Sequence, residues 1–310
     1  MMMHQEQHKQ HKTMHSLKSK LVQLNSIINN KNICFLDLPI HHNFGDALIM
    51  LGSLDFFKQN DYKIKSYSTY FNWHAQSLTD NDVIVFQGGG NFGDIHKTHQ
   101  LHREKIIQSY INNKIVILPQ TIFFNDRINY KKTCAILKQH PDLHICVRDG
   151  KSRELALNMT HHVYLIPDMA HQLYPIECDA SETNKKNNSM QIKRQDLESD
   201  ELDIKLTVDL ICDWKTILGM HRYPISLLRQ IQKLLNIIYL NSYSANFTTE
   251  LLIKYSYHVL SVVVKKLNNY ETIYSSRLHG FILANLLQKQ AFLIDNSYGK
   301  NKQYFAAWFR

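Results

Sequence analysis

Short apolar segments alternate with amphipathic segments through most of this 310-residue chain, and this alternation constrains the fold more than any other feature. Each apolar segment has the length of a buried strand, and the segments between them repeat apolar residues at helical spacing. We expect strands over 33–38, 63–68, 83–86, 114–118, 144–147, 163–166, 271–274 and 291–294. Strands that alternate with helices pair in parallel, so the sequence predicts an α/β fold with mostly parallel sheets.

The length predicts more than one domain, because an average domain has about 150 residues. Residues 176–202 are polar and highly charged with few apolar side chains, which is typical of a connection between domains. We therefore expect a basic, His-rich arm and helix over 1–30 and a first α/β domain over 31–175. A linker over 176–202 and a second α/β domain over 203–310 follow.

Composition excludes several classes of protein. The first residues have no continuous apolar core, so they do not resemble a secretory signal, and no run of about 18 apolar residues predicts a membrane span. The five cysteines form no CxxC pair, which argues against a zinc site and a disulfide scaffold. We expect a cytoplasmic protein, and a position at the inner face of the plasma membrane stays open.

The net charge is +9, but the Lys and Arg residues are scattered and no nucleic-acid motif is present. We therefore expect no nucleic-acid partner, and the positive field suits anionic substrates or lipid headgroups equally well. Near the start, His4, His8, His11 and His15 recur at helical spacing and either bind a metal ion or belong to a polar arm. The arm is the favoured interpretation, with the first helix over 14–30.

Two glycine-containing motifs follow predicted strands. In GGGNFGD, residues 88–94, Gly89 and Gly90 let backbone N–H groups approach a phosphate, and Asp94 is either a catalytic carboxylate or a helix cap. In NFGD, Asn43 and Asp46 lie at a strand-to-helix junction, where Asp46 either caps the helix or binds substrate.

Two arginines also follow predicted strands. Arg148 comes directly before a helix that contains Ser152, and a guanidinium there either binds a carboxylate or phosphate through two hydrogen bonds or forms a surface ion pair. In SSRLHG, Arg277 and His279 fall in the first turn of a helix, where anions are favoured. His279 is the best general acid–base candidate of the chain. Asp168 is a further polar residue after a strand, with a structural turn as the alternative.

Taken together and in order, the motifs NFGD, GGGNFGD, VRD, PDMA, RQDLE and SSRLHG resemble those of the polysaccharide pyruvyl transferase family, over about Phe35 to Asp295. The resemblance implies two Rossmann-like domains in a GT-B-like arrangement with the active site in the interdomain cleft. It also implies transfer of the pyruvyl group of phosphoenolpyruvate to two hydroxyls of a sugar, giving a ketal, with no cofactor and no metal.

The resemblance implies roles for individual residues. His279 corresponds to the general acid, Asp94 to the base, and Arg148 and Arg277 to the groups that hold the carboxylate and the phosphate. The remaining substrate-binding positions that we expect are Leu278, Asn43, Asp46, Gly89, Gly90 and Ser152. RQDLE supplies Arg194, Asp196 and Glu198. One departure is His42, which stands where the family often has Gly.

Two other functions stay open. The first is a GT-B-type glycosyltransferase that uses a nucleotide sugar, and the second is a non-catalytic carbohydrate- or nucleotide-binding protein of a polysaccharide assembly complex. For the pyruvyl transferase, the expected partners are phosphoenolpyruvate and a sugar acceptor. The acceptor is either a lipid-linked diphosphate oligosaccharide, with peripheral contact at the inner membrane, or a nucleotide sugar.

Overall fold

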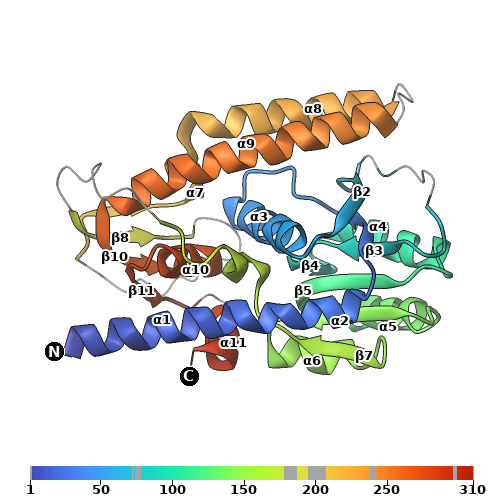
Figure 1. Cartoon of the computed structure of the whole chain (residues 1–310), viewed down its shortest axis with the longest axis horizontal. Helices are drawn as coiled ribbons and strands as arrows, with labels where there is room; N and C mark the ends of the chain where they lie inside the picture. Colours follow the sequence, from blue (N-terminus) through green and yellow to red (C-terminus); the bar gives the residue numbers. More distant parts are fainter. Residues whose placement is uncertain are drawn as a thin grey trace.

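Two parallel sheets form the framework of the protein in a computed structural model (Figure 1). The structure describes residues 2–71, 73, 78–177, 187–194, 207–237, 242–295 and 299–309. We call the seven-stranded sheet with its helices the first unit and the four-stranded sheet with its helices the second unit. Within each of the two sheets, every pair of neighbouring strands is parallel, which confirms the predicted α/β fold.

The first unit has the strand order β2-β1-β3-β5-β6-β7, with β4 paired to β5. Its strands are β1 (Asn32–Leu36), β2 (Lys63–Tyr67), β3 (Val83–Phe86), β4 (Gly89–Gly93), β5 (Ile115–Phe123), β6 (Leu143–Val147) and β7 (His162–Leu165). Its helices are α3 (Phe44–Gln59), α4 (Lys97–Ser109), α5 (Arg127–Leu137) and α6 (Gly150–Ala156). Strand β4 was not among the strands predicted from the sequence, because the predicted strand over 83–86 ends before the glycine-rich motif.

The second unit has the strand order β11-β10-β8-β9. Its strands are β8 (Asn187–Ile192), β9 (Leu210–Cys212), β10 (Tyr270–Ser275) and β11 (Gln290–Leu293). Its helices are α7 (Trp214–Leu218), α8 (Arg222–Ile237), α9 (Ser242–Asn268), α10 (Leu278–Leu286) and α11 (Lys300–Trp308). The expected linker over 176–202 therefore contains β8, a strand that pairs with both β10 and β9.

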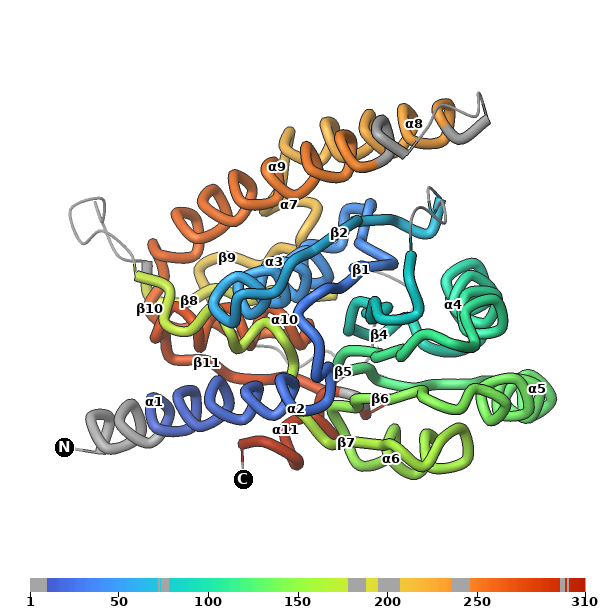
Figure 2. Tube along the Cα trace, turned by 45° about the vertical axis from the view of Figure 1, so that its right-hand side comes forward, coloured from blue at the N-terminus to red at the C-terminus, as the bar shows by residue number. Residues whose placement is uncertain are grey.

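The first helix joins the cores of the two units. Helix α1 (Met2–Lys20) continues through a 3₁₀ turn into α2 (Leu24–Ile28). Met14 and Leu17 belong to the core of the second unit, whereas Leu21 and Leu24 belong to that of the first. Figure 2 shows this helix passing along both units. The helix therefore begins earlier than the predicted residue 14, and the expected polar arm is helical.

The N-terminal histidines have ordinary structural contacts where their side chains are described. His11 Nδ1 lies 2.5 Å from the hydroxyl of Tyr174, and the ring of His15 packs edge-on against the same tyrosine. The side chains of His4 and His8 lie outside the described part. Among the residues that the structure describes, no group of three His, Cys, Asp or Glu side chains could hold a metal ion.

The described cysteines form no disulfide bond. Cys34, Cys134, Cys146 and Cys212 are buried and free, and Cys178 lies outside the described residues. No described helix is long and apolar enough to cross a membrane.

The close approach of α3 to the 3₁₀ turn Met169–Leu173 requires a glycine at position 52. A methyl group at Gly52 would lie 2.2 Å from the backbone oxygen of Met169, which cannot move like a flexible side chain. We predict that Gly52→Ala lowers the free energy of unfolding by about 1–3 kcal/mol in urea denaturation. Gly150→Ala is the matched control, because nothing lies within 4 Å of its added methyl group. Equal stability of the two variants would contradict this packing.

Candidate functional site

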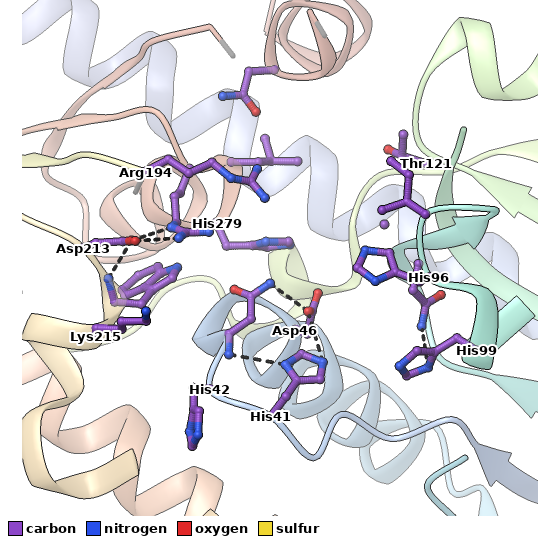
Figure 3. Close-up of a pocket in the computed structure, with 18 of the residues that line it drawn as sticks. His41, His42, Asp46, His96, His99, Thr121, Arg194, Asp213, Lys215 and His279 are labelled. Carbon is purple, nitrogen blue, oxygen red and sulfur yellow. Dashed lines mark hydrogen bonds and ion pairs between the residues drawn. The ribbon is translucent and has the colours of Figure 1, made fainter. Parts of the chain in front are cut away.

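A cavity of about 560 Å³ lies where the carboxyl ends of strands from both sheets meet (Figure 3). The first unit lines it with His41, His42, Asn43, Asp46, Gly90, Asn91, Ile95, His96, His99, Thr121 and Arg148. The second unit lines it with Arg194, Asp213, Trp214, Lys215, Arg277, Leu278, His279 and Asn301. Ligands bind at the carboxyl ends of parallel strands, so the cavity is the candidate active site.

Arg148 enters the cavity directly after β6. Its Nε donates to Thr121 Oγ1 at 2.9 Å, and its Nη1 donates to Asp168 Oδ2 at 2.5 Å. A methyl group at Gly90 would lie 3.5 Å from Nη2, so the glycine-rich strand passes close to the guanidinium. The side chain is buried, and these contacts fix its position at the cavity wall.

Asp168 connects the arginine of the first unit to the histidine of the second. It is fully buried, and Oδ2 also lies 3.3 Å from His279 Nε2. Burial by itself would raise the pKa of Asp168, but His279 and Arg148 outweigh burial and hold this pKa well below its usual range. Asp168 is therefore ionised, and it positions both side chains. The sequence had left open whether Asp168 belongs to the site or is a structural turn residue.

Arg277 has its own carboxylate partner. Its Nε and Nη2 donate to the two oxygens of Asp213 at 2.5 and 2.6 Å, a bidentate pair. Asp213 follows β9 and also caps α7 by accepting from the N–H of Trp214. We did not predict Asp213, although an acidic residue directly after a short apolar run and before a helix was a usable signal.

The NFGD motif of the first unit packs against the SSRLHG motif of the second. Asn43 caps α3 by accepting from the N–H of Gly45, and its amide donates to Asp46 Oδ2 at 2.8 Å. A methyl group at Gly45 would lie 2.5 Å from His279 Nδ1, so glycine leaves room for the imidazole. His41 Nε2 lies 3.5 Å from Asp46 Oδ2, which places a histidine and a carboxylate together at the cavity.

His42 and Arg194 join other elements to the cavity wall. His42 Nε2 lies 2.9 Å from Ser226 Oγ of α8, so the departure from glycine serves a contact with the second unit. Arg194 lines the cavity and donates its backbone N–H to Ser276 Oγ. Asp196 and Glu198 of the same motif lie outside the described residues.

Three predicted site residues, Asp94, Ser152 and Gly89, do not line the cavity. The carboxylate of Asp94 accepts the backbone N–H groups of Asn125 and Asp126, both at 2.8 Å, and thereby holds the loop before α5. Ser152 is fully buried, and its Oγ accepts the N–H of Ile122 at 2.8 Å. The structure gives Asp94 and Ser152 structural contacts in place of the expected positions at the site. Gly89 has a positive φ of 128° beside the cavity-lining Gly90.

A buried charged cluster that we did not predict adjoins the cavity. His99 Nδ1 lies 2.6 Å from Asp37 Oδ1, and Asn91 donates to Asp37 Oδ2 at 2.9 Å. Arg103 is fully buried and donates to Asn91 Oδ1. Burial would raise the pKa of Asp37, but His99 and Arg103 lower it below its usual range. This cluster fixes Asn91 and His99 at the cavity wall.

The buried His171 next to Asp168 makes stability depend on pH. Burial lowers its pKa to about 4, whereas an unfolded histidine has about 6.5. Between these values only the unfolded chain binds the proton, so we predict that the free energy of unfolding falls as pH falls from about 6.5 to about 4. One such group contributes at most about 1.4 kcal/mol per pH unit.

Urea denaturation across this pH range tests the effect. His171→Gln removes the titrating group and should make the dependence shallower, whereas the exposed His161→Gln should leave it unchanged. An unchanged slope in His171→Gln would show that this residue does not carry the pH dependence.

Known proteins are similar to this chain in sequence. A sequence profile described as "Polysaccharide pyruvyl transferase" matches residues 43–298. The protein named "Putative pyruvyl transferase EpsO", from Bacillus subtilis, is 38% identical over 300 residues, covering 96% of this chain and 91% of that protein. "Pyruvyl transferase 1" from Schizosaccharomyces pombe is 24% identical over 161 residues, covering 47% of this chain and 39% of that protein.

One solved structure has a similar fold. An uncharacterized protein from Klebsiella pneumoniae superposes with a TM-score of 0.53 at 21% sequence identity, over 94% of this chain and 93% of that one. The profile match and the extensive identity to the Bacillus subtilis protein confirm the resemblance predicted from the motifs. This chain belongs to the polysaccharide pyruvyl transferase family.

Proposed function

We propose that this protein transfers the pyruvyl group of phosphoenolpyruvate to two hydroxyls of a sugar, forming a cyclic ketal in the biosynthesis of a surface polysaccharide or exopolysaccharide. The observation that carries the proposal is the convergence of Arg148, Arg277 and His279 on one cavity. The two arginines follow strands of different sheets, so a ligand held by both must lie between the units.

Phosphoenolpyruvate suits this pair of arginines because it carries two separate anionic groups, a carboxylate and a phosphate. Each guanidinium is already oriented by a carboxylate, Arg148 by Asp168 and Arg277 by Asp213. Prepositioned donors lose less conformational entropy when a ligand binds. A charge-assisted hydrogen bond contributes roughly 1.5–3 kcal/mol, and each arginine can form at least one with the donor.

The proposed chemistry begins with proton transfer from His279 to the methylene carbon of phosphoenolpyruvate. This creates a methyl group and a positive charge at the neighbouring carbon, to which the first sugar hydroxyl adds with loss of its proton. The carbon–oxygen bond to phosphate then breaks, and the second hydroxyl adds with loss of its proton. One hydroxyl proton thus balances the new methyl C–H bond, and the other leaves with inorganic phosphate.

The hydroxyl protons need an acceptor inside the cavity. Asp94 lies outside it, and its carboxylate is engaged by the loop before α5. Asp46 and His41 line the cavity 3.5 Å apart and can take this role, because a carboxylate beside an imidazole offers two proton-accepting groups. We therefore assign the base to the Asp46–His41 pair in place of Asp94.

The role of His279 is tested by replacing its ring. Loss of general acid catalysis costs about 10²–10⁴-fold in rate, so we predict that His279→Gln lowers phosphate release from phosphoenolpyruvate by that factor. Phosphate release in the presence of candidate sugar acceptors measures this, with the ketal product identified by mass spectrometry. The exposed His161→Gln is the matched control and should retain full activity.

Two results oppose the proposal. A folded His279→Gln variant with normal turnover would contradict the assignment of the acid. Release of a nucleoside diphosphate from a nucleotide sugar, without consumption of phosphoenolpyruvate, would show that the protein catalyses glycosyl transfer and not pyruvyl transfer.

A further inference from the structure

Helix α8 has a stripe of exposed apolar side chains that no described part of the chain covers. Tyr223, Leu227 and Leu234 are each more than half exposed, at 55%, 58% and 56%, and Ile231 lies between them at 36%. Residues spaced by three and four positions lie on one face of a helix. The opposite face is different, because Ile225 and Leu228 pack into a small core with α9. The helix is therefore apolar on two faces, and only one of them is used inside the protein.

The charged residues in the sequence around the stripe all have one sign. Residues 214–249 contain no Asp or Glu, but they contain Lys215, Arg222, Arg229 and Lys233. Arg229 and Lys233 are one helical turn apart, and both lie over the ring of Phe71, at 5.7 and 5.3 Å. The segment that carries the apolar stripe is thus basic, and its sequence has no acidic residue between positions 214 and 249.

The stripe lies on an element that adjoins the cavity. Ser226 of α8 contacts the cavity-lining His42 at 2.9 Å, and α7 supplies Trp214 and Lys215 to the cavity wall. Both views show α8 and α9 together along one edge of the molecule (Figures 1 and 2). A surface that contacts this edge therefore lies close to elements of the cavity wall.

We propose that α8 docks on an anionic membrane surface, with its apolar stripe in the headgroup–acyl boundary and its cations against lipid phosphates. An amphipathic helix with Lys and Arg beside an apolar face binds membranes in this way. A second copy of the chain is the weaker candidate, because it would bring two cationic helices together without an acidic partner in residues 214–249. The proposal of membrane docking depends only on the surface of α8. The further idea that docking brings a lipid-linked sugar to the cavity rests on the proposed function.

Cosedimentation of the full-length protein with lipid vesicles tests the docking. We predict binding to phosphatidylglycerol vesicles that weakens with added salt, and little binding to phosphatidylcholine vesicles. The double variant Leu227→Gln/Leu234→Gln should lower the affinity at least about tenfold, because each change removes buried apolar area. Ile128→Gln on α5 is the matched control, since Ile128 is 75% exposed and lies in the first unit.

Charge is tested separately from apolar area. Lys233→Glu should weaken binding to phosphatidylglycerol vesicles, whereas Lys131→Glu on α5 should weaken it much less, although both variants change the net charge equally. The proposal is overturned if the wild type does not bind these vesicles or if the double variant binds as well as the wild type. A wild-type dimer that the double variant abolishes, seen by sedimentation velocity without vesicle binding, also overturns it.

Activity on a soluble acceptor separates this proposal from the proposed chemistry. The double variant should release phosphate at the wild-type rate in solution, because neither leucine lines the cavity. Vesicle binding without pyruvyl transfer would contradict the proposed function alone. Pyruvyl transfer without vesicle binding would contradict the docking alone.

Discussion

The buried carboxylate of Asp168 is the interaction on which the arrangement of the site depends. It lies at the end of the first unit, yet it contacts Arg148 of that unit and His279 of the second. Its backbone N–H donates to the hydroxyl of Tyr304 in α11, so a helix from the end of the chain is tied to the same point. A buried carboxylate without a partner costs free energy. Asp168 therefore favours the arrangement in which Arg148 of one unit and His279 of the other both contact it.

Ion pairing with a carboxylate also explains why both arginines of the cavity are oriented. Arg277 is held by Asp213 across the second unit, as Arg148 is held by Asp168 in the first. Both arginines belong to ion pairs, so a bound anion must share or displace a carboxylate. This favours ligands with strong, separated negative charges. The sequence around α8, residues 214–249, is likewise basic with no Asp or Glu, and α8 also has an exposed apolar stripe, which is the basis of the proposed docking.

Sequence patterns predicted the elements better than the partnerships between them. Eight of the eleven strands that the structure describes were predicted, because their apolar runs are local signals, whereas β4, β8 and β9 were missed. Strand β8 begins with polar residues and is recognisable only through its pairing with β10 and β9. Arg148 and His279 were expected at the site from their positions after strands, and both line the cavity. Their partner Asp168 is 111 positions before His279, and no local pattern indicates such a contact. Asp94 was expected at the site but does not line the cavity, and the motif gives no sign of its bonds to a distant loop.

The most direct test of the account is a crystal structure of the protein with phosphoenolpyruvate and without an acceptor. We expect the ligand to lie in the cavity, with its carboxylate and phosphate bonded to Arg148 and Arg277 and its methylene carbon facing His279. A ligand bound by only one unit, or one whose methylene carbon is turned away from His279, would contradict the central claim that the two units share one donor site.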